Sequence, residues 1–381
     1  MRRALYSEEH EAFRETIRAL IDHEVVPHYA EWEAAGSLPK SFYRRLGELG
    51  VHGIQVPEKW GGAGIESLRF SAVIAEEAAR AAVTLGSLRV HTDIVLPYLL
   101  AYGTTGQLTT WMPGFISGEC MTSIAMTEPG TGSDLVSIGT TARLDGDHWV
   151  LNGAKTFITG AANAGLILVV CRTSAPACDD RRGGLSILLV DAGSPGFSVG
   201  RHLDKIGLRA QDTVELSFGD VAVPAENLLG DEGCAFSYLT RNLAQERLSI
   251  ALSCYAAAAA AVTMTTAYVS DRAVFGKPLG GFQNTKFVLA ECHTEVLAAR
   301  ALVDQCVIAH EEGELTPADA AAAKLFCSEV QGRVVDRCLQ LHGGYGYVLE
   351  YPIARLYADA RVSRIYGGTS EVLKSVISKS L

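Results

Sequence analysis

Glu246 and Arg247 place a carboxylate beside a guanidinium at the start of a segment that runs to Arg272 without Pro or Gly. A carboxylate can act as a general base, and an apolar surrounding raises its pKa toward the range that this role needs. It can equally be a first-turn charge that interacts with a helix dipole. Gly276 and Pro278 follow the segment, and such residues commonly end helices. The sequence therefore predicts a helix over residues 246–272 whose first turn carries a reactive or a capping carboxylate.

The far end of this predicted helix carries a second set of candidate ligand-binding side chains, Arg272, Phe275 and Lys277. At about 1.5 Å of rise per residue, the two ends lie roughly 40 Å apart. A cation is also favourable at a helix C-terminus without any ligand, and Phe275 can equally belong to the core. The distance predicts two separate binding regions, one at each end.

A third candidate is the loop Gly130-Thr131-Gly132, which has the start of a dinucleotide-binding pattern. It fails as a Rossmann fingerprint, because the third Gly is missing and no strand–helix pair with a later acidic residue surrounds it. The longer string around it offers backbone N–H groups and hydroxyls that could face a ligand. By itself this string is equally well explained as an ordinary polar turn.

The composition excludes several classes of protein. The chain has 381 residues and a formal net charge of -10 without a long basic run, so nucleic-acid binding has no electrostatic basis. No apolar run approaches the roughly 20 residues of a membrane span, and the charged N-terminus has no signal-peptide core. The Cys are scattered without a CxxC pair, and the His are scattered as well. We therefore expect reduced thiols, no metal site and a cytoplasmic location.

The spacing of apolar residues along the sequence divides the chain into three parts. Residues 1–122 carry apolar side chains at helical spacing, as at Phe13 and Ile17. Residues 123–230 contain short alternating runs between turn signals, and residues 231–381 return to the helical pattern. Alternating βαβ units, which would indicate a doubly wound sheet, are lacking. The predicted fold class is α+β, with an N-terminal helical domain, a central small antiparallel β-barrel or sandwich, and a C-terminal four-helix bundle.

Individual elements can be placed within the last two parts. Residues 149–151 are a strand candidate that leads into a turn at Asn152 and Gly153, and residues 175–184 are typical of an exposed hairpin loop. Further strands are expected at residues 166–171, 185–190 and 214–218. Helices are expected at residues 234–244, 246–271, 284–312, 317–342, 351–364 and 370–380.

Seven strings of residues, taken together and in order, resemble the acyl-CoA dehydrogenase family. Each string alone is weak, but the combination is specific and covers essentially the whole chain. The strings lie at residues 126–134 (MTEPGTGSD), 155–160 (KTFITG), 209–212 (RAQD), 223–230 (VPAENLLG), 271–278 (DRAVFGKP), 340–347 (QLHGGYGY) and 365–371 (IYGGTSE).

The resemblance implies the same three-domain order, bound FAD, and oxidation of an acyl-CoA thioester to its trans-2-enoyl product. It also implies an electron-transfer flavoprotein as electron acceptor and a homotetramer built as a dimer of dimers. The residues implied at the flavin are Met126, Thr127, Gly132, Ser133, Phe157 and Thr159. Those implied at the adenosine-diphosphate part are Arg272, Phe275, Gln283, Gln340, Gly343, Gly344, Thr369 and Glu371. Those implied at the substrate are Ser133, Arg247, Tyr366 and Gly368.

Two positions depart from the common pattern of the family. Phe157 stands where many members have Trp beside the flavin, so an aromatic ring is kept. Gly367 stands where many members have the Glu that removes the α-proton. Long-chain and isovaleryl-type members instead place this base directly before an Arg, at the position of Glu246. The resemblance thus implies Glu246 as the catalytic base and the backbone N–H of Gly367 as a donor to the thioester carbonyl.

Three rival functions stay open on the sequence alone. An acyl carrier protein can replace CoA as the carrier of the acyl group. A flavin monooxygenase on the same fold is a second rival, although it needs no α-proton base such as Glu246. A non-catalytic protein of this fold that binds acyl groups or a partner is the third. The sequence does not predict the length or branching of the acyl chain.

Overall fold

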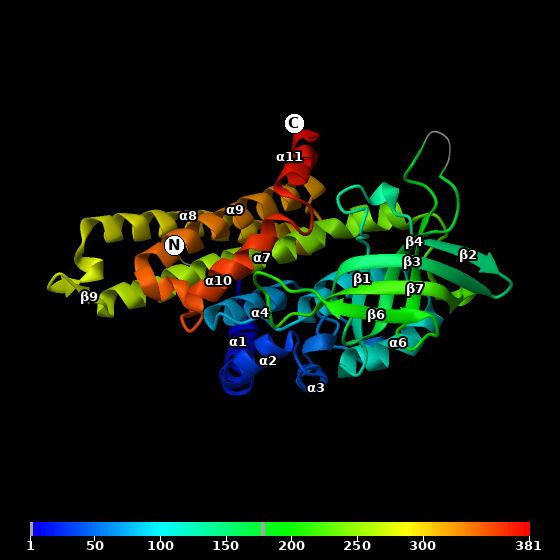
Figure 1. Ribbon diagram of the computed structural model, residues 1–381, viewed down its shortest axis with the longest axis horizontal. Coiled ribbons are helices and arrows are strands. Elements are labelled where there is room, and N and C mark those ends of the chain that lie inside the picture. Colours follow the sequence, from blue (N-terminus) through cyan, green and yellow to red (C-terminus); the bar gives the residue numbers. More distant parts are fainter. Residues whose placement is uncertain (1–2, 177–179) are drawn as a thin grey trace.

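One helix, α7 (Ala235–Asp271), runs along the long axis of the molecule and reaches from the β-domain to the opposite end (Figure 1). The computed structural model describes residues 3–176 and 180–381. The prediction of a helix break before Glu246 is wrong, because neither Pro nor Gly interrupts the 37 residues of α7. Glu246 therefore lies about three turns inside the helix. A dipole interaction, which acts within the first turn, no longer accounts for this carboxylate.

Helix α7 is also the most apolar long helix in the described part of the chain. An 18-residue window of it has a mean hydropathy of 1.6, so the expectation that no run has the length and composition of a membrane span is wrong. However, 78% of that window is buried inside the structure. The helix packs against α4 (Arg69–Arg80), α8 (Gln283–Glu311) and α9 (Pro317–His342). Its apolar side chains thus form the core of the helical domains.

Further helices complete the two helical domains, and the predicted N-terminal and C-terminal helical domains are confirmed. The N-terminal helices lie below α7 in the view of Figure 1, and α8, α9 and α11 lie above it. The N-terminal domain also contains α1 (Glu8–Leu20), α2 (Tyr29–Ala35), α3 (Lys40–Glu48), α5 (Leu96–Tyr102) and α6 (Thr105–Ser117). The C-terminal domain also contains α10 (Pro352–Ala360) and α11 (Ser370–Ser378). The domain limits at residues 122 and 230 stay predictions.

The central domain is built on one strongly bent sheet with the strand order β6-β7-β3-β2-β4-β5-β8, and β1 pairs with β4. A parallel pairing joins β1 to β4 and another joins β2 to β4, so the sheet is mixed and the expectation of a purely antiparallel one is wrong. The strands are β1 (Met121–Ala125), β2 (Thr141–Asp145), β3 (His148–Thr159), β4 (Ala164–Arg172), β5 (Leu185–Asp191), β6 (Phe197–His202), β7 (Thr213–Pro224) and β8 (Leu228–Leu229).

The position of β4 between two cores explains why its sequence is continuously apolar. Ile167 and Val169 face the core enclosed by the bent sheet, whereas Leu166 and Leu168 face a second core shared with α5 and α6. All four side chains are fully buried. Because both faces of the strand are covered, the alternation of a half-exposed strand is absent.

The predicted turn at Asn152 and Gly153 is wrong, because β3 continues through both residues. The φ of Gly153 is +149°, and a Cβ there would lie 2.5 Å from Thr140 Oγ1. Glycine is therefore required for close approach to the neighbouring strand and not for a reversal of the chain. The reversal lies earlier, at Gly146, between β2 and β3. Of the predicted loop at residues 175–184, residues 177–179 lie outside the described part.

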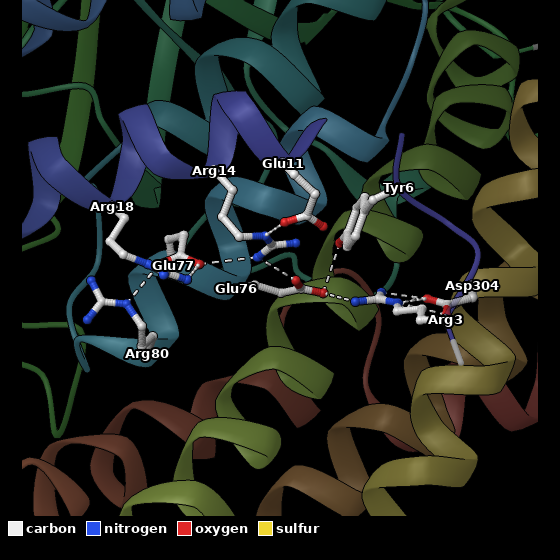
Figure 2. A network of polar contacts seen from close by, with 9 residues as sticks. All are labelled: Arg3, Tyr6, Glu11, Arg14, Arg18, Glu76, Glu77, Arg80 and Asp304. Atoms are coloured by element: carbon white, nitrogen blue, oxygen red, sulfur yellow. Dashed lines mark hydrogen bonds and ion pairs between the residues drawn. The ribbon is translucent and has the colours of Figure 1, made fainter. Parts of the chain in front are cut away.

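A network of ion pairs fastens the N-terminal segment to α4 and α8 (Figure 2). Arg3 pairs with Glu76 of α4 and, at 2.6 Å, with Asp304 of α8. Tyr6 donates a hydrogen bond of 2.9 Å to Glu76, and Arg14 pairs with the same carboxylate at 2.9 Å. Segments some 300 positions apart in the chain are joined by these contacts. The two helices that they join, α4 and α8, both pack against α7, which carries part of the site described below.

Glu77 is the buried centre of this network, with a side chain only 3% exposed. Burial alone would raise its pKa, but hydrogen bonds from Arg18, Arg80 and Arg14 outweigh that effect and hold the pKa at about 2. Its ordinary value is 4.5. The folded state thus gains stability from ionised Glu77 above pH 4.5 and loses it as the pH falls toward 2.

We expect Glu77→Gln to lower the free energy of unfolding at pH 7 by roughly 2 kcal/mol, because three guanidinium groups lose their common anion and are only partly exposed. The difference from the wild type should shrink as the pH falls below 4.5. Urea unfolding at several pH values measures this. Glu11→Gln is the matched control, since that carboxylate is 57% exposed and pairs only at the surface. Equal effects of the two changes would contradict the assignment.

Candidate active site

The turn Gly367-Gly368 is held against α7 and α9 by two buried cations. Arg247 Nε of α7 donates to the carbonyl oxygen of Gly367 at 3.3 Å. Lys324 Nζ of α9 donates to the carbonyl oxygen of Gly368 at 2.7 Å. The two glycines have φ values of +62° and +98°, in the left-handed region that favours Gly. With both carbonyls fixed, the N–H of Gly367 donates no hydrogen bond to any described residue and is left available.

Glu246 faces this turn from α7. A Cβ placed on Gly367 would lie 3.8 Å from Glu246 Oε1 and only 2.4 Å from Ile250 Cδ1. The space that a side chain at position 367 would occupy is therefore already taken by α7. The structure thus brings together the two residues that the sequence predicts as the reactive pair.

The environment of Glu246 raises its pKa. Its Oε2 atom is buried and has no hydrogen-bond partner among the described residues. Burial raises the pKa of the carboxyl group, and the positive charges of Arg89, Arg247 and Lys324 oppose that shift without cancelling it. A buried carboxyl oxygen without a donor is unusual in a folded protein. The arrangement is typical of a general base that accepts a proton from a substrate.

Two of these cations were missed by sequence reasoning. Lys324 is fully buried, and burial lowers its pKa to about 8. Arg89 lies just before a π-helical turn, Val90–Val95, and donates from Nη2 to the Tyr366 hydroxyl at 3.3 Å. Each is a single charge within an apolar run, AAAAKLF and LGSLRV respectively. A lone charge in such a run is a signal that could have identified both residues.

The strings predicted at the flavin meet in the β-domain. Lys155, whose side chain is fully buried, donates from Nζ to the carbonyl oxygen of Met126 and to Glu128 Oε1, both at 2.9 Å. The carboxylate of Glu128 also accepts hydrogen bonds from the backbone N–H groups of the two residues directly after Ile138. The backbone N–H of Thr156 donates to the carbonyl oxygen of Thr127 at 2.9 Å. These bonds fix the loop that carries Gly132 and Ser133, which are both exposed.

Phe157 has an unusual conformation at an irregularity in the pairing of β3 with β7. Its φ is +59°, and its side chain is 66% exposed. A bulky residue with positive φ is strained, and such strain often marks a functional position. The exposed ring, the Thr159 hydroxyl two residues later and the fixed loop together form a surface that fits a planar aromatic ring system such as a flavin.

A cavity of about 160 Å³ is lined by neighbours of both groups of residues, although neither Glu246 nor Phe157 lines it directly. Tyr366, Arg89 and Ser249 line it from the helical side, and Gln211 lines it from the β-domain. Gln211 Nε2 also lies 3.5 Å from Thr159 Oγ1, at the predicted flavin surface. The cavity therefore lies between the predicted flavin residues and the part of α7 that follows Glu246.

A separate group of predicted cofactor residues lies at the opposite end of α7. Figure 1 shows the hairpin of β9 (Ala273–Val274) and β10 (Lys277–Pro278) at the far end from the β-domain. Phe275 in this hairpin is 96% exposed. The guanidinium of Arg272 lies 5.4 Å from the ring centre of Tyr345. This contact places the Gly343 and Gly344 turn beside the hairpin. Gln283 and Gln340 lie at the adjoining ends of α8 and α9.

Thr369 and Glu371 do not lie with that group. Thr369 caps α11, its hydroxyl accepting from the N–H of Val372 at 3.3 Å, and Glu371 lies in the first turn of the same helix. Both directly follow the Gly367-Gly368 turn. One chain therefore does not bring all the predicted cofactor residues together. Those at the hairpin and those at the flavin surface are separated by the length of α7.

Comparison with known proteins identifies the class of this fold and site. Three family models match in order: the acyl-CoA dehydrogenase N-terminal domain at residues 7–119, the middle domain at residues 123–221 and the C-terminal domain at residues 235–381. The chain belongs to the acyl-CoA dehydrogenase family. It is therefore an FAD-dependent oxidoreductase of the acyl-CoA dehydrogenase type.

Individual relatives are similar over nearly their whole length. The mitochondrial long-chain specific acyl-CoA dehydrogenase of Sus scrofa is 44% identical over 379 residues, which span 100% of this chain and 88% of that protein. An acyl-CoA dehydrogenase structure from Geobacillus kaustophilus has a TM-score of 0.96 and 44% identity, covering 98% of each chain. A glutaryl-CoA dehydrogenase of Mycobacterium smegmatis in complex with FADH2 has a TM-score of 0.90 and 27% identity, covering 99% of this chain and 95% of that one.

Proposed function

We propose that this chain oxidises an acyl-CoA thioester to the trans-2-enoyl-CoA, with Glu246 as the base that removes the α-proton. The observation that carries the proposal is the buried, unpartnered Oε2 of Glu246 beside the Gly367 turn. A proton acceptor of raised pKa, placed in a dry surrounding, is suited to removing a weakly acidic proton. The alternative explanation, a charge at a helix start, has no support in a helix that begins at Ala235.

The backbone at Gly367 supplies the second requirement of the reaction. Removal of an α-proton places negative charge on the thioester oxygen, so a fixed donor at that oxygen lowers the barrier. The free N–H of Gly367 is the donor that we propose, and it needs no side chain at this position. Arg247 and Lys324 hold the carbonyl groups of the turn, so the N–H has a fixed direction before substrate binds.

We propose FAD as the bound cofactor, and the described residues fit it. The exposed, strained Phe157, the Thr159 hydroxyl and the loop fixed by Lys155 would hold the flavin end. When bound, FAD supplies an acceptor for the hydride that leaves the β-carbon. The structurally similar Mycobacterium smegmatis dehydrogenase is a complex with FADH2, which supports this choice. An electron-transfer flavoprotein is the acceptor that we propose for the electrons afterwards.

The test is anaerobic titration of the purified yellow protein with acyl-CoA thioesters. We expect loss of the oxidised flavin absorbance with at least one acyl-CoA, and no change with free CoA as the control. A flavin that reacts only with oxygen and an electron donor would support the monooxygenase instead. A colourless protein that does not take up FAD would support the non-catalytic alternative. Acyl groups on an acyl carrier protein, tested in parallel, decide between the two carriers.

We further propose that a second copy of the chain completes each FAD site, within a homotetramer. The hairpin residues Arg272 and Phe275 lie roughly 40 Å along α7 from Glu246, too far for one FAD to reach both. The side chains of Phe275 and Tyr347 are 96% and 90% exposed, which is unusual for aromatic residues without a partner. Light scattering should give a mass of about four times 40.7 kDa. A monomer that retains FAD would contradict the shared site.

A further inference from the structure

Arg89 is a cation in the cavity to which the proposed reaction assigns no contact with the substrate. It lines the cavity together with Tyr366, and its guanidinium lies 5.3 Å from the centre of the Tyr366 ring. Nη2 donates to the Tyr366 hydroxyl. Nη1 is buried and has no hydrogen-bond partner among the described residues. Arg89 thus presents a buried Nη1 amino group without a hydrogen-bond acceptor in the described part of the chain, beside the residue that precedes the Gly367 turn.

The nearby carboxylates do not satisfy this group. Asp93 accepts hydrogen bonds from the hydroxyls of Ser71 at 2.9 Å, Thr92 at 3.0 Å and Ser249 at 2.6 Å. Its oxygens are therefore already paired with neutral donors. Glu246 is near enough for the charge of Arg89 to oppose the rise of its pKa. In the described part of the chain, neither carboxylate comes within ion-pair distance of Arg89.

A guanidinium with one unpaired nitrogen is unfavourable in a cavity that receives only hydrocarbon. A buried charged donor without an acceptor loses its hydration and gains no hydrogen bond in return. An unsubstituted acyl chain offers no hydrogen-bond acceptor, so Arg89 would keep an unpaired donor in every complex with such a substrate. An acyl chain that carries an oxygen acceptor would satisfy Nη1, and a carboxylate would do so most strongly because both partners are charged.

On the basis of the function proposed above, we propose that Arg89 is a specificity-determining residue that binds an oxygen substituent on the acyl group. The favoured substrates are then acyl-CoA thioesters with a hydroxyl, carbonyl or carboxylate on the chain, and unsubstituted straight chains are disfavoured. The cavity is close in size to an engineered cavity of about 150 Å³ that admits benzene, so chains of about six carbons are the appropriate probes.

The experiment compares hexanoyl-CoA, 6-hydroxyhexanoyl-CoA and adipoyl-CoA on the wild-type holoenzyme and on Arg89→Met. We expect kcat/KM of the wild type to be about 10- to 100-fold higher with at least one oxygen-bearing substrate than with hexanoyl-CoA. The two oxygen-bearing probes separate a neutral acceptor from a charged one. In Arg89→Met the preference should fall to about one. The same comparison with acyl chains of four and eight carbons shows whether the position of the oxygen substituent along the chain matters.

A binding measurement keeps the test independent of turnover. Equilibrium dialysis of the corresponding enoyl-CoA products should show the same loss of preference in Arg89→Met. Arg89→Lys keeps the charge but not the planar guanidinium, and should retain part of the preference. Arg143→Met on β2, where the side chain is 70% exposed, is the control and should change nothing.

Two outcomes have distinct meanings. A wild type that prefers hexanoyl-CoA, with the same ratios in Arg89→Met, would overturn the role of Arg89 and leave the dehydrogenase proposal standing. A wild type whose flavin is reduced by no thioester of any length would overturn the proposed function itself. If Arg89→Met does not fold, Arg89→Lys decides, since an unchanged substrate ratio in that variant would also overturn the proposal.

Discussion

Glu246→Gln is expected to lower the rate of flavin reduction by acyl-CoA by a factor of about 10²–10⁴. The amide keeps the volume of the side chain but cannot accept the α-proton. FAD binding should persist, because the residues that fit the flavin belong to the β-domain and not to α7. Stopped-flow absorbance under anaerobic conditions measures the rate, and the flavin content of the purified variant measures binding.

The pH dependence of the wild type provides a second readout of the same assignment. Burial raises the pKa of Glu246, and only the deprotonated form can accept a proton. The rate constant should therefore fall as the pH is lowered through this raised pKa, and the fall should begin at a higher pH than for an ordinary Glu. In Glu246→Gln this pH dependence should disappear.

Glu232→Gln is the matched control, because that residue is exposed in the loop that leads into α7. It should reduce its flavin at the wild-type rate. The same rate in Glu246→Gln would show that Glu246 is only a buried charge, and the base would then have to be sought elsewhere. A loss of FAD in Glu246→Gln would instead point to a role in cofactor binding.

Moving the base to position 367 is the second change for which a large effect is expected. From sequence alone, Glu246→Gln with Gly367→Glu should restore part of the activity, because both positions face the same substrate carbon. The structure adds an obstacle, since a Cβ at position 367 would lie 2.4 Å from Ile250 Cδ1. The φ of Gly367, +62°, adds backbone strain for any other residue. We therefore expect little recovery from the double change.

Trimming Ile250 should remove the steric part of this obstacle. The triple variant Glu246→Gln, Gly367→Glu, Ile250→Ala is expected to reduce its flavin at least about 10-fold faster than Glu246→Gln alone, within the range of general-base effects. Stopped-flow reduction of the single, double and triple variants measures this series. The control is Glu246→Gln with Ile250→Ala, which opens the same space without a carboxylate.

The control decides how the series is interpreted. If it recovers as much as the triple variant, the gain comes from space and not from a relocated base. If neither the double nor the triple variant recovers, position 367 does not face the α-carbon of the bound substrate. That result would also remove the support for the Gly367 N–H as the donor to the thioester oxygen.

The order of the three domains followed from local patterns in the sequence. Apolar residues recur at helical spacing at Phe13 and Ile17 and alternate with polar residues along β7. Such patterns arise within a single element, because they depend only on residues a few positions apart. The resemblance carried by the seven strings added the family and most of the predicted site residues. The replacement of Glu by Gly at position 367 drew attention to Glu246.

Local patterns failed where long-range packing decides the outcome. The Asn152-Gly153 pair is a strong turn signal, yet pairing of β3 with β7 on one side and close packing on Thr140 on the other keep it extended. Helix α7 has no internal stop signal, so its true start could not be distinguished from a break before Glu246. The mixed sheet depends on which strands meet, and sequence separation alone does not determine that.

What the sequence by itself determined is the set of chemical groups: a carboxylate at 246, a glycine at 367 and an aromatic ring at 157. What only the tertiary structure decided is their environment. Lys324 and Arg89 come from two other helical segments, and their charges act on Glu246 because burial removes the water that would screen them. The rigid length of α7 separates Glu246 from Arg272 in space. Reactivity depends on such surroundings, and these form only when distant segments pack together.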